Sequence, residues 1–485
     1  MNRIILFASA ALAAVSALGD VRALTPDPWG GAPDSWQMKR HQEKLAEIAR
    51  GGAKVVFVGD SITHFWETNG KEQLEKYFSE GEAKMLDLGT SADRTEHVLW
   101  RLTEGGELDG YAAKIVFLMI GTNNAGHFPF AEEPPTDAIL GIREILRVIR
   151  EKQPEAKVVL TAIFPRGKDA NDPERLRNDV VNREIMRFAD GKTVFWCDLA
   201  DDFLSVYGRL SRDLFPDLLH PNALGYELWY AAIKPYLDYA LSEGKLPAPA
   251  NRYAPINMKR SLRYEQPQTV FPASRIRSEG YGEFDWWLDR LAQKRREIVE
   301  SNGAIDLVLF GDSITHNWES IGWESLAALR KTYSVLDLGY SGDRTQHLVW
   351  RGSNGELDGY AARCVMLMIG TNNQGDAPED VAAGVREVLN VIMRKQPEAR
   401  ILLLPVFPRG EATSKERAQN RRVNELIRPF ADGRQILWID FTKKFLDHQG
   451  DVKWIMPDRL HPNAEGYSKI WLPEIAPILK MVIGK

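Results

Sequence analysis

The stretch Val55–His64 reads VVFVGDSITH, and residues 307–316 repeat it as LVLFGDSITH. In both copies a short run of apolar residues ends at a Gly-Asp-Ser sequence. A run that is apolar on both faces is typical of a strand in a parallel sheet covered by helices on both sides. Such sheets carry their chemistry in the loops that follow the strands. The stretch therefore predicts both the fold class and the location of the functional residues.

Seven motifs recur in the same order in the two halves of the chain. They are GDSITH, LDLG, DRT-x-H-x-x-WR, GELDGYAA, LMIGTNN, FPRG and HPNA-x-GY, beginning at residues 59, 86, 93, 106, 118, 164 and 220 and again at 311, 336, 343, 355, 367, 407 and 461. The copies are 313 − 61 = 252 residues apart at the serine and 461 − 220 = 241 apart at the histidine. A period this long indicates two whole domains rather than a solenoid.

Each half alternates short apolar runs with amphipathic segments, such as Ile142, Ile145, Leu146 and Ile149 at helical spacing. This alternation predicts a three-layer α/β sandwich. The expected strands are 54–58, 85–88, 114–120, 157–163 and 193–198, then 306–310, 334–338, 363–369, 400–406 and 435–440. Five prolines between residues 246 and 272 predict a linker. We therefore expect domains at 24–245 and 273–485.

The N-terminus resembles a secretory signal peptide. Arg3 precedes the apolar stretch Ile4–Leu18, and small residues end in Val21-Arg22-Ala23. The stretch is shorter than the ~20 residues needed to cross a bilayer. We predict a signal peptide at 1–23, with Val15-Ser16-Ala17 as a second candidate cleavage site. This predicts a secreted or periplasmic protein without stable membrane insertion.

The composition is that of an ordinary soluble globular protein, with 44% hydrophobic and 27% charged residues among 485. The formal net charge is 62 − 67 = −5, which argues against a nucleic-acid partner. The two cysteines, Cys197 and Cys364, lie in strand-like runs of different halves. We interpret them as core residues, because two such thiols form neither a disulfide framework nor a zinc site.

Several polar residues fall directly after the predicted strands, twice over. A serine there lies near the start of a helix, where backbone N–H groups can stabilise an oxyanion, although Asp-Ser is also a common helix cap. An asparagine could donate to the same oxyanion or support a turn. An aspartate three residues before a histidine lies on the same side of a helical turn and could orient the ring. These residues are Ser61, Asn123, Asp217 and His220 in the first half and Ser313, Asn372, Asp458 and His461 in the second.

The remaining histidines fit structural roles better than catalytic ones. Four of them recur and are expected to pack or to form supporting hydrogen bonds, namely His64, His97, His316 and His347. Three have no counterpart and are expected at the surface, namely His41, His127 and His448. The recurrent tryptophans at 66, 100, 318 and 350 could line a pocket, and core packing is the expectation for at least half of them.

The motifs GDRTQHLVWR, GELDGY, IGTNN and FPRG resemble the SGNH (GDSL-type) esterases and lipases, in the branch similar to platelet-activating-factor acetylhydrolases. The resemblance covers nearly all of each half. It implies two tandem flavodoxin-like α/β/α sandwiches, each with a five-stranded parallel sheet. It also implies hydrolysis of carboxylic esters, often acetyl esters, without a metal or other cofactor.

The resemblance also assigns roles to the paired residues. It implies that Ser61 and Ser313 are nucleophiles, that His220 and His461 are bases, and that Asp217 and Asp458 orient them. The oxyanion hole would use the serine N–H, the amide of Asn123 or Asn372, and a backbone N–H in the second motif. That position is Gly342 in the second half but Ala92 in the first. If the position needs a positive φ, alanine there costs about 1–2 kcal/mol.

We therefore expect a secreted serine esterase that removes acetyl groups from a small-molecule or glycan ester. Two alternatives stay open: a hydrolase of lipid or phospholipid esters, and a chain in which the first domain is a binding module and only the second is catalytic. A metallophosphoesterase needs several histidine ligands in distinct motifs, and one Asp-x-x-His per half does not supply them. Related acetylhydrolase-like domains pair, which makes the two halves candidates for an intrachain pseudo-dimer.

Overall fold

The structure is a computed structural model that describes residues 21–29, 34–126, 133–205, 208–242, 267–276 and 285–484. The chain forms two compact units. The first contains the described residues up to 242, and the second contains 267–275 and 289–484. Each is described by itself.

The first domain is built on a five-stranded sheet in the order β2-β1-β3-β4-β5, with all neighbours parallel. The strands are β1 Val55–Gly59, β2 Met85–Gly89, β3 Ile115–Met119, β4 Lys157–Thr161 and β5 Val194–Cys197. All five lie within two residues of their predicted starts, because each is a short buried apolar run. The expected fold class is confirmed.

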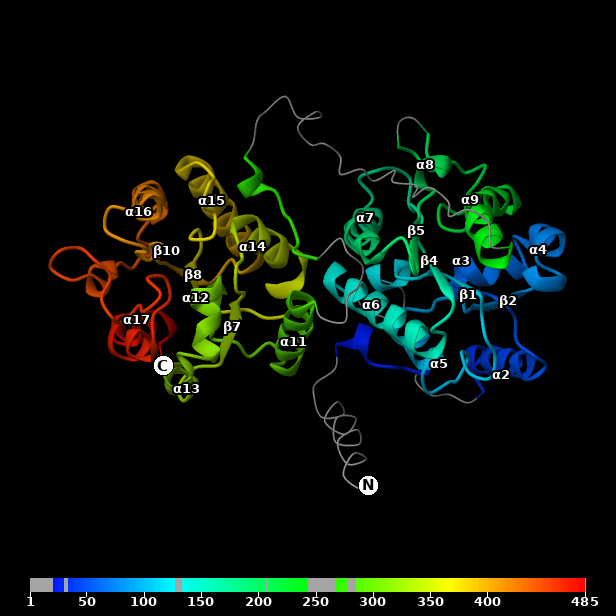
Figure 1. Cartoon of the computed structure of the whole chain (residues 1–485), viewed down its shortest axis with the longest axis horizontal. Helices are drawn as coiled ribbons and strands as arrows, with labels where there is room; N and C mark the ends of the chain where they lie inside the picture. The colour runs from blue at the N-terminus through cyan, green and yellow to red at the C-terminus, as the bar shows by residue number, and fades with distance from the viewer. Residues whose placement is uncertain are drawn as a thin grey trace, which may run out of the picture. The chain divides into compact units, whose positions relative to one another are not determined.

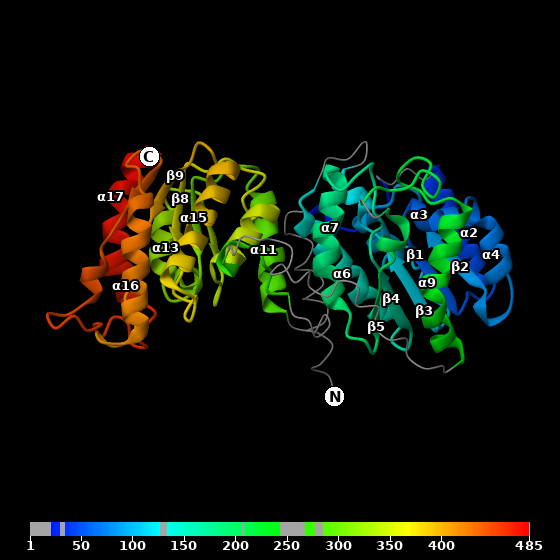
Figure 2. The ribbon, with the colours of Figure 1, turned by 90° about the horizontal axis from the view of Figure 1, so that it is seen from above.

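Helices cover both faces of this sheet, and Figure 2 shows β3, β4 and β5 between α6 and α9. The face that carries Phe57 packs on Trp229 of α9, whereas α5, α6 and α7 pack in sequence on one another. The helices are α2 Trp36–Ala49, α3 Ser61–His64, α4 Lys71–Tyr77, α5 Thr95–Leu102, α6 Pro135–Lys152, α7 Pro173–Ile185, α8 Ala200–Phe203 and α9 Ala223–Ser242.

The second domain repeats the same sheet, in the order β10-β9-β8-β6-β7. Figure 1 shows α14 and α15 on one side of the sheet and α13 and α17 on the other. Its strands are β6 Leu307–Gly311, β7 Val335–Gly339, β8 Cys364–Met368, β9 Arg400–Leu403 and β10 Ile436–Trp438. Its helices are α11 Trp286–Glu300, α12 Ser313–His316, α13 Trp323–Arg330, α14 Thr345–Arg351, α15 Pro378–Lys395, α16 Lys415–Ile427 and α17 Leu472–Ile483.

Strand β6 shows why the strand runs are apolar throughout. Val308 and Phe310 belong to the core cluster that contains α15, whereas Leu307 and Leu309 belong to the cluster that contains Trp471. Successive side chains point to opposite faces of a strand, so a sheet between two helical layers buries every position. The two cysteines lie in β5 and β8 as buried free thiols, in agreement with their predicted core role.

Each domain begins with a short segment that we call its strap, residues 21–29 in the first domain and 267–275 in the second. Each strap contains a 3-10 turn, η2 Arg22–Leu24 or η8 Gln268–Val270, which packs on α5 and α6 or on α14 and α15. Glycine in the longer helix permits this approach. A methyl group on Gly141 would lie 2.8 Å from the carbonyl oxygen of Ala23, and one on Gly384 would lie 2.8 Å from that of Thr269.

The straps overlap two segments that were expected to lie outside the domains, the linker at 246–272 and the signal peptide at 1–23. Residues 267–272 of the expected linker pack on the second domain; residues 243–266 lie outside the described residues. The expected signal peptide also lies outside them, except for Val21–Ala23. Val21 and Ala23 are buried in the first domain, so cleavage after Ala23 would remove core residues, whereas cleavage after Ala17 would leave the strap intact.

No helix within the described ranges is both long and apolar enough to cross a membrane.

Candidate active site

The motif serine of each domain begins the short helix after the first strand of the sheet. Asp60 caps α3 by accepting a hydrogen bond from the Ile62 N–H at 3.0 Å, and Asp312 does the same for Ile314. Burial raises the pKa of each of these carboxyls to about 7. The preceding Gly59 is required by close packing, because a methyl group there would lie 2.5 Å from the Met119 carbonyl oxygen.

The first domain brings three of the predicted residues into one hydrogen-bonded line. His220 Nε2 lies 2.8 Å from Ser61 Oγ, and His220 Nδ1 lies 2.6 Å from Asp217 Oδ2. The serine is buried and the histidine is half-buried at the surface. This order of hydroxyl, imidazole and carboxylate is the one that transfers a serine proton to the ring and stabilises the resulting imidazolium.

The second domain repeats the same line of contacts. His461 Nε2 lies 2.9 Å from Ser313 Oγ, and His461 Nδ1 lies 2.6 Å from Asp458 Oδ2. The two domains therefore present the same arrangement at the carboxyl ends of their sheets.

The aspartate and histidine of each site meet through a tight turn, not through the helical turn that the spacing predicts. Asp217 Oδ1 accepts hydrogen bonds from the Leu219 and His220 N–H groups. Leu218 between them has a φ of 64°, and Arg459 in the second domain has a φ of 58°. The left-handed residue folds the carboxylate back onto the ring, so the expected helical geometry was wrong although the pair itself meets.

Hydrogen bonds hold this aspartate ionised. Burial acts to raise the pKa of Asp217, but the backbone N–H and the ring of His220 outweigh it and lower the pKa below its ordinary value. The pKa of Asp458 is lowered by the same balance. A negative carboxylate is the state that can stabilise a charged histidine.

The tyrosine of the last motif ties the histidine loop to the serine helix. Tyr226 donates its hydroxyl proton to the Ile62 carbonyl oxygen at 2.6 Å, and Tyr467 donates to Ile314 at 2.7 Å. Both rings are fully buried. This contact explains why HPNA-x-GY ends in tyrosine, a role that the sequence did not reveal.

The loops after the second and third strands meet beside the serine. Asn123 Nδ2 donates to the Asp93 carbonyl oxygen at 2.8 Å, and Asn372 Nδ2 donates to that of Asp343 at 2.9 Å. Each amide group has a second N–H available for an oxyanion. Ala92, next to Asp93, has a φ of 68°.

The position of Ala92 is left-handed in both domains, since Gly342 has a φ of 77°. Ala92 therefore has a positive φ, a backbone conformation that costs an alanine about 1–2 kcal/mol.

The arginine of FPRG holds the asparagine loop in place. Arg166 donates to the carbonyl oxygen of Thr122 at 3.2 Å, and Arg409 donates to that of Thr371 at 2.8 Å. The sequence marks this arginine by its recurrence but does not reveal the contact.

The histidines after the serine support the loop that precedes the oxyanion position. His64 Nδ1 lies 2.9 Å from Ser91 Oγ, and His316 Nδ1 lies 2.9 Å from Ser341 Oγ. Burial, followed by the charge of a neighbouring arginine, lowers the pKa of each histidine to about 4.

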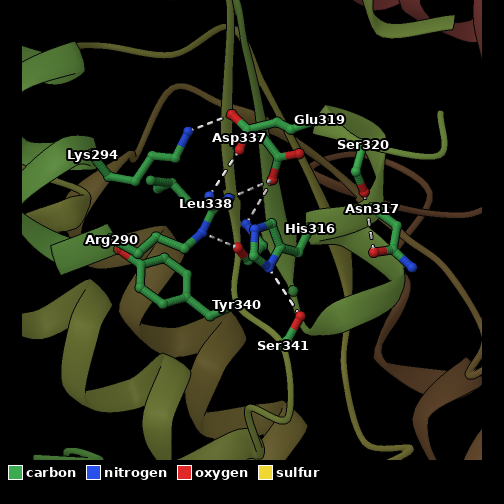
Figure 3. Close-up of polar contacts among 12 residues, drawn as sticks. Arg290, Lys294, His316, Asn317, Glu319, Ser320, Asp337, Leu338, Tyr340 and Ser341 are labelled. Carbon is green, nitrogen blue, oxygen red and sulfur yellow. Dashed lines mark hydrogen bonds and ion pairs between the residues drawn. The ribbon is translucent and has the colours of Figure 1, made fainter. Parts of the chain in front are cut away.

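Figure 3 shows His316 between Ser341 and the ion-pair cluster behind the loop. In this cluster Glu319 pairs with Arg290 and Lys294, and Arg290 also donates to the Gly339 carbonyl oxygen at 2.7 Å. The cluster fixes the end of β7, from which the loop departs.

The other histidines lie outside the site. His97 Nδ1 accepts from the Arg94 N–H at 3.1 Å and His347 does the same for Arg344, so both are helix caps. His41 is buried and contacts Glu107 at 2.7 Å, so its expected surface location was wrong. This burial has no sequence signal, because the partner of His41 is 66 residues away. His127 lies outside the described residues.

Trp66 and Trp318 are fully buried and pack against core aromatic residues. No group of three or more histidine, cysteine, aspartate or glutamate residues suited to a metal ion occurs within the ranges that the structure describes.

The first site carries an aromatic neighbour that the second lacks. The Phe65 ring lies 4.8 Å from the His220 ring, measured between centroids. The equivalent residue after His316 is Asn317.

A profile described as the GDSL-like Lipase/Acylhydrolase family matches residues 57–228 and again 309–469. The chain belongs to this family. Both matches begin in the first strand of a domain and end in or just before its last helix. Membership confirms the predicted enzyme class, carboxylic ester hydrolase, and the tandem arrangement.

Several individual proteins are similar to parts of this chain. Platelet-activating factor acetylhydrolase IB subunit alpha1 of Bos taurus is 34% identical over 170 residues, covering 34% of this chain and 71% of the relative. Subunit alpha2 of Rattus norvegicus is 33% identical over 194 residues, covering 39% and 82%. A solved GDSL-like lipase from Bacteroides thetaiotaomicron aligns with 41% of this chain and 98% of its own, at 19% identity and a TM-score of 0.35.

Proposed function

We propose that the chain hydrolyses short-chain esters, acetyl esters above all, with one Ser-His-Asp triad in each domain. The observation that carries this proposal is the repeated line of contacts, in which the histidine lies 2.8 Å and 2.9 Å from the two serine hydroxyls and 2.6 Å from each aspartate. The acetyl preference is supported by the relatives named acetylhydrolases.

In the second domain, His461 takes the proton of Ser313 as Oγ attacks the ester carbonyl carbon. The negative oxygen of the tetrahedral intermediate is stabilised by the backbone N–H groups of Ser313 and Gly342 and by the amide of Asn372. The C–O bond to the alcohol then breaks, and His461 donates the proton to the leaving oxygen. Water repeats the steps and releases the acid from the acyl-serine.

The first domain follows the same course with its own residues. Ser61 is the nucleophile, His220 the base and Asp217 its partner, while Ala92 and Asn123 take the places of the second domain's oxyanion donors. This proposal makes the first domain an enzyme rather than a binding module.

The full chain with Ser61→Ala and Ser313→Ala tests the proposal on p-nitrophenyl acetate. We expect hydrolysis to fall at least about 1000-fold, while a control chain with Ser79→Ala and Ser468→Ala, two exposed serines, keeps its activity. Full activity in the first double variant would overturn the proposal. The single variants assign activity to each domain.

We further propose that the natural substrate is an acetylated carbohydrate outside the cell. The expected signal peptide supports this location. The named relatives favour a second candidate, an acetyl ester of a phospholipid. Rates on acetylated oligosaccharides, on an acetylated phospholipid and on octanoate esters separate these substrates.

The export proposal has its own test. The burial of Val21 and Ala23 supports removal of the leader before the strap. N-terminal sequencing of the secreted protein is expected to begin at Leu18, and a mature chain beginning at Leu24 would contradict this.

A further inference from the structure

The two sites share their triads but differ in the strap residue that covers the oxyanion loop. We propose that this residue sets substrate charge: Arg275 adapts the second site to esters that carry a carboxylate or phosphate, and Trp29 adapts the first site to uncharged esters. The inference rests on the proposed esterase function and concerns the specificity of each site.

Trp29 and Arg275 occupy equivalent positions. Each lies six residues after the buried strap residue that packs on the glycine of the longer helix, Ala23 or Thr269. Trp29 Nε1 donates to Asp93 Oδ1 at 2.7 Å, and Arg275 Nη1 lies 3.3 Å from Asp343 Oδ1. Both therefore reach the same carboxylate, directly after the oxyanion position.

In the second site a guanidinium group lies against the oxyanion loop. A methyl group on Gly342 would lie 3.1 Å from Arg275 Nη1, and the same nitrogen donates to the Ser341 carbonyl oxygen at 2.5 Å. The Arg275 side chain remains 31% exposed, so it can meet a substrate. Arg344, two residues after Gly342, is exposed as well.

In the first site Trp29 occupies the position of Arg275. Arg94, which corresponds to Arg344, is neutralised by ion pairs. The Trp29 indole stacks on the His97 ring with centroids 4.1 Å apart and an angle of 22°. Arg94, the counterpart of Arg344, is fully buried and pairs with Glu96 and Glu133. Among the described residues of the first site, Trp29 and the buried Arg94 therefore stand where the second site has the half-buried Arg275 and the exposed Arg344.

Backbone conformation links the strap to its loop. Trp29 has a φ of 57°, which is rare for an aromatic residue and marks a position held by its surroundings. Alanine accompanies tryptophan in the first site, whereas glycine accompanies arginine in the second, where a methyl group would crowd the guanidinium. The two positions therefore differ together between the sites: the first site has Trp29 with Ala92, and the second has Arg275 with Gly342.

The charge difference has a direct consequence for substrates. A carboxylate or phosphate near the ester would approach two exposed guanidinium groups in the second site, and arginine pairs with either anion through charge-assisted hydrogen bonds. In the first site the same anion would meet an indole ring where the second site holds the Arg275 guanidinium, and it would lose hydration there without that partner. A neutral ring could instead stack on that indole.

The test uses the full chain and a matched pair of acetyl esters, 4-acetoxybenzoate and its uncharged methyl ester. Ser61→Ala leaves only the second site, and Ser313→Ala leaves only the first. We expect the ratio of kcat/KM, charged over neutral, to be at least about fivefold higher for the second site. The ester 4-acetoxyphenyl phosphate shows whether phosphate replaces carboxylate.

Substitutions at the strap then locate the cause. In the Ser61→Ala chain, Arg275→Gln and Arg275→Trp should lower the ratio about fivefold, and Arg275→Lys should keep most of it. In the Ser313→Ala chain, Trp29→Arg should raise the ratio. Arg422→Gln, which removes an exposed cation from α16, should leave it unchanged.

The outcomes separate this inference from the esterase function. Hydrolysis of the neutral ester with equal ratios at both sites would overturn the charge assignment and leave the esterase intact. An equal loss on both esters in Arg275→Gln would also overturn it, because the arginine would then support only the oxyanion loop. Failure of every chain on the neutral ester would overturn both.

Discussion

Two residues with positive φ shape the candidate active site of each domain. Leu218 and Arg459 fold the aspartate onto the histidine, while Ala92 and Gly342 occupy the proposed oxyanion position. A positive φ costs a non-glycine residue about 1–2 kcal/mol, which the surrounding contacts must offset. These positions are therefore the places where single substitutions report on the site.

We expect Ala92→Gly to raise the free energy of unfolding of the first domain by about 0.5–1 kcal/mol, because relief of strain exceeds the added entropy of the unfolded chain. Gly342→Ala should lower that of the second domain by about 1 kcal/mol. Urea denaturation followed by tryptophan fluorescence measures both. A decrease for Ala92→Gly or an increase for Gly342→Ala would contradict the strain assigned to the left-handed conformation at these positions.

The aspartate of the second triad should matter mainly for turnover. In the Ser61→Ala chain, Asp458→Asn should lower kcat on p-nitrophenyl acetate by roughly 1000-fold, because the amide no longer stabilises the charged form of His461. An unchanged circular dichroism spectrum would show that the fold is kept. A decrease in kcat of less than tenfold would contradict the role of Asp458 as the partner of His461.

Burial, followed by the charge of Arg94, lowers the pKa of His97 to about 3. His97 becomes protonated near pH 6.5 in the unfolded chain but only near pH 3 in the folded protein. The free energy of unfolding therefore falls as the pH is lowered from 6.5 toward 3. Between pH 7.5 and pH 5 the wild type should lose about 2 kcal/mol more than His97→Gln. Parallel urea titrations of the two chains measure this difference, and equal losses would contradict the lowered pKa.

At the scale of elements, each strap depends on one glycine of the helix beneath it. Gly384→Val should destabilise the second domain by about 1–3 kcal/mol or more, because the side chain meets Thr345 and the Thr269 carbonyl oxygen. Arg394→Val, at an exposed position of the same helix, is the matched control for β-branching. Thermal denaturation compares them, and equal effects would mean that the strap contact contributes nothing.

At the scale of the whole molecule, two complete triads predict two sets of turnovers. The kcat/KM values of Ser61→Ala and Ser313→Ala on p-nitrophenyl acetate should sum to that of the wild type within about twofold, since each substitution removes one site and leaves the other. A sum far below the wild-type value would show that each site depends on the other serine. Zero activity in one single variant would show that only one domain is catalytic.

Features that depend on neighbouring residues were predicted from the sequence, whereas features that depend on contacts between distant residues were not. The strands were predictable because a parallel strand buried on both faces is apolar at nearly every position, as in Val55–Val58. The roles of Tyr226 and Arg166 were not, because each contacts a loop far away in the sequence. The pairing of Asp217 with His220 was predicted, but its turn was not, because a left-handed leucine has no sequence signature.

The sequence by itself determined the duplication, the parallel sheets and the residues of both proposed triads, because apolar runs and repeated motifs record local requirements. Only the tertiary structure decided that His41 is buried, that the straps belong to the domains, and that Trp29 and Arg275 reach equivalent carboxylates. The straps share no motif, and their equivalence rests on contacts with helices more than 70 residues away. Such contacts depend on where the folded chain brings two segments together, which no short stretch of sequence encodes.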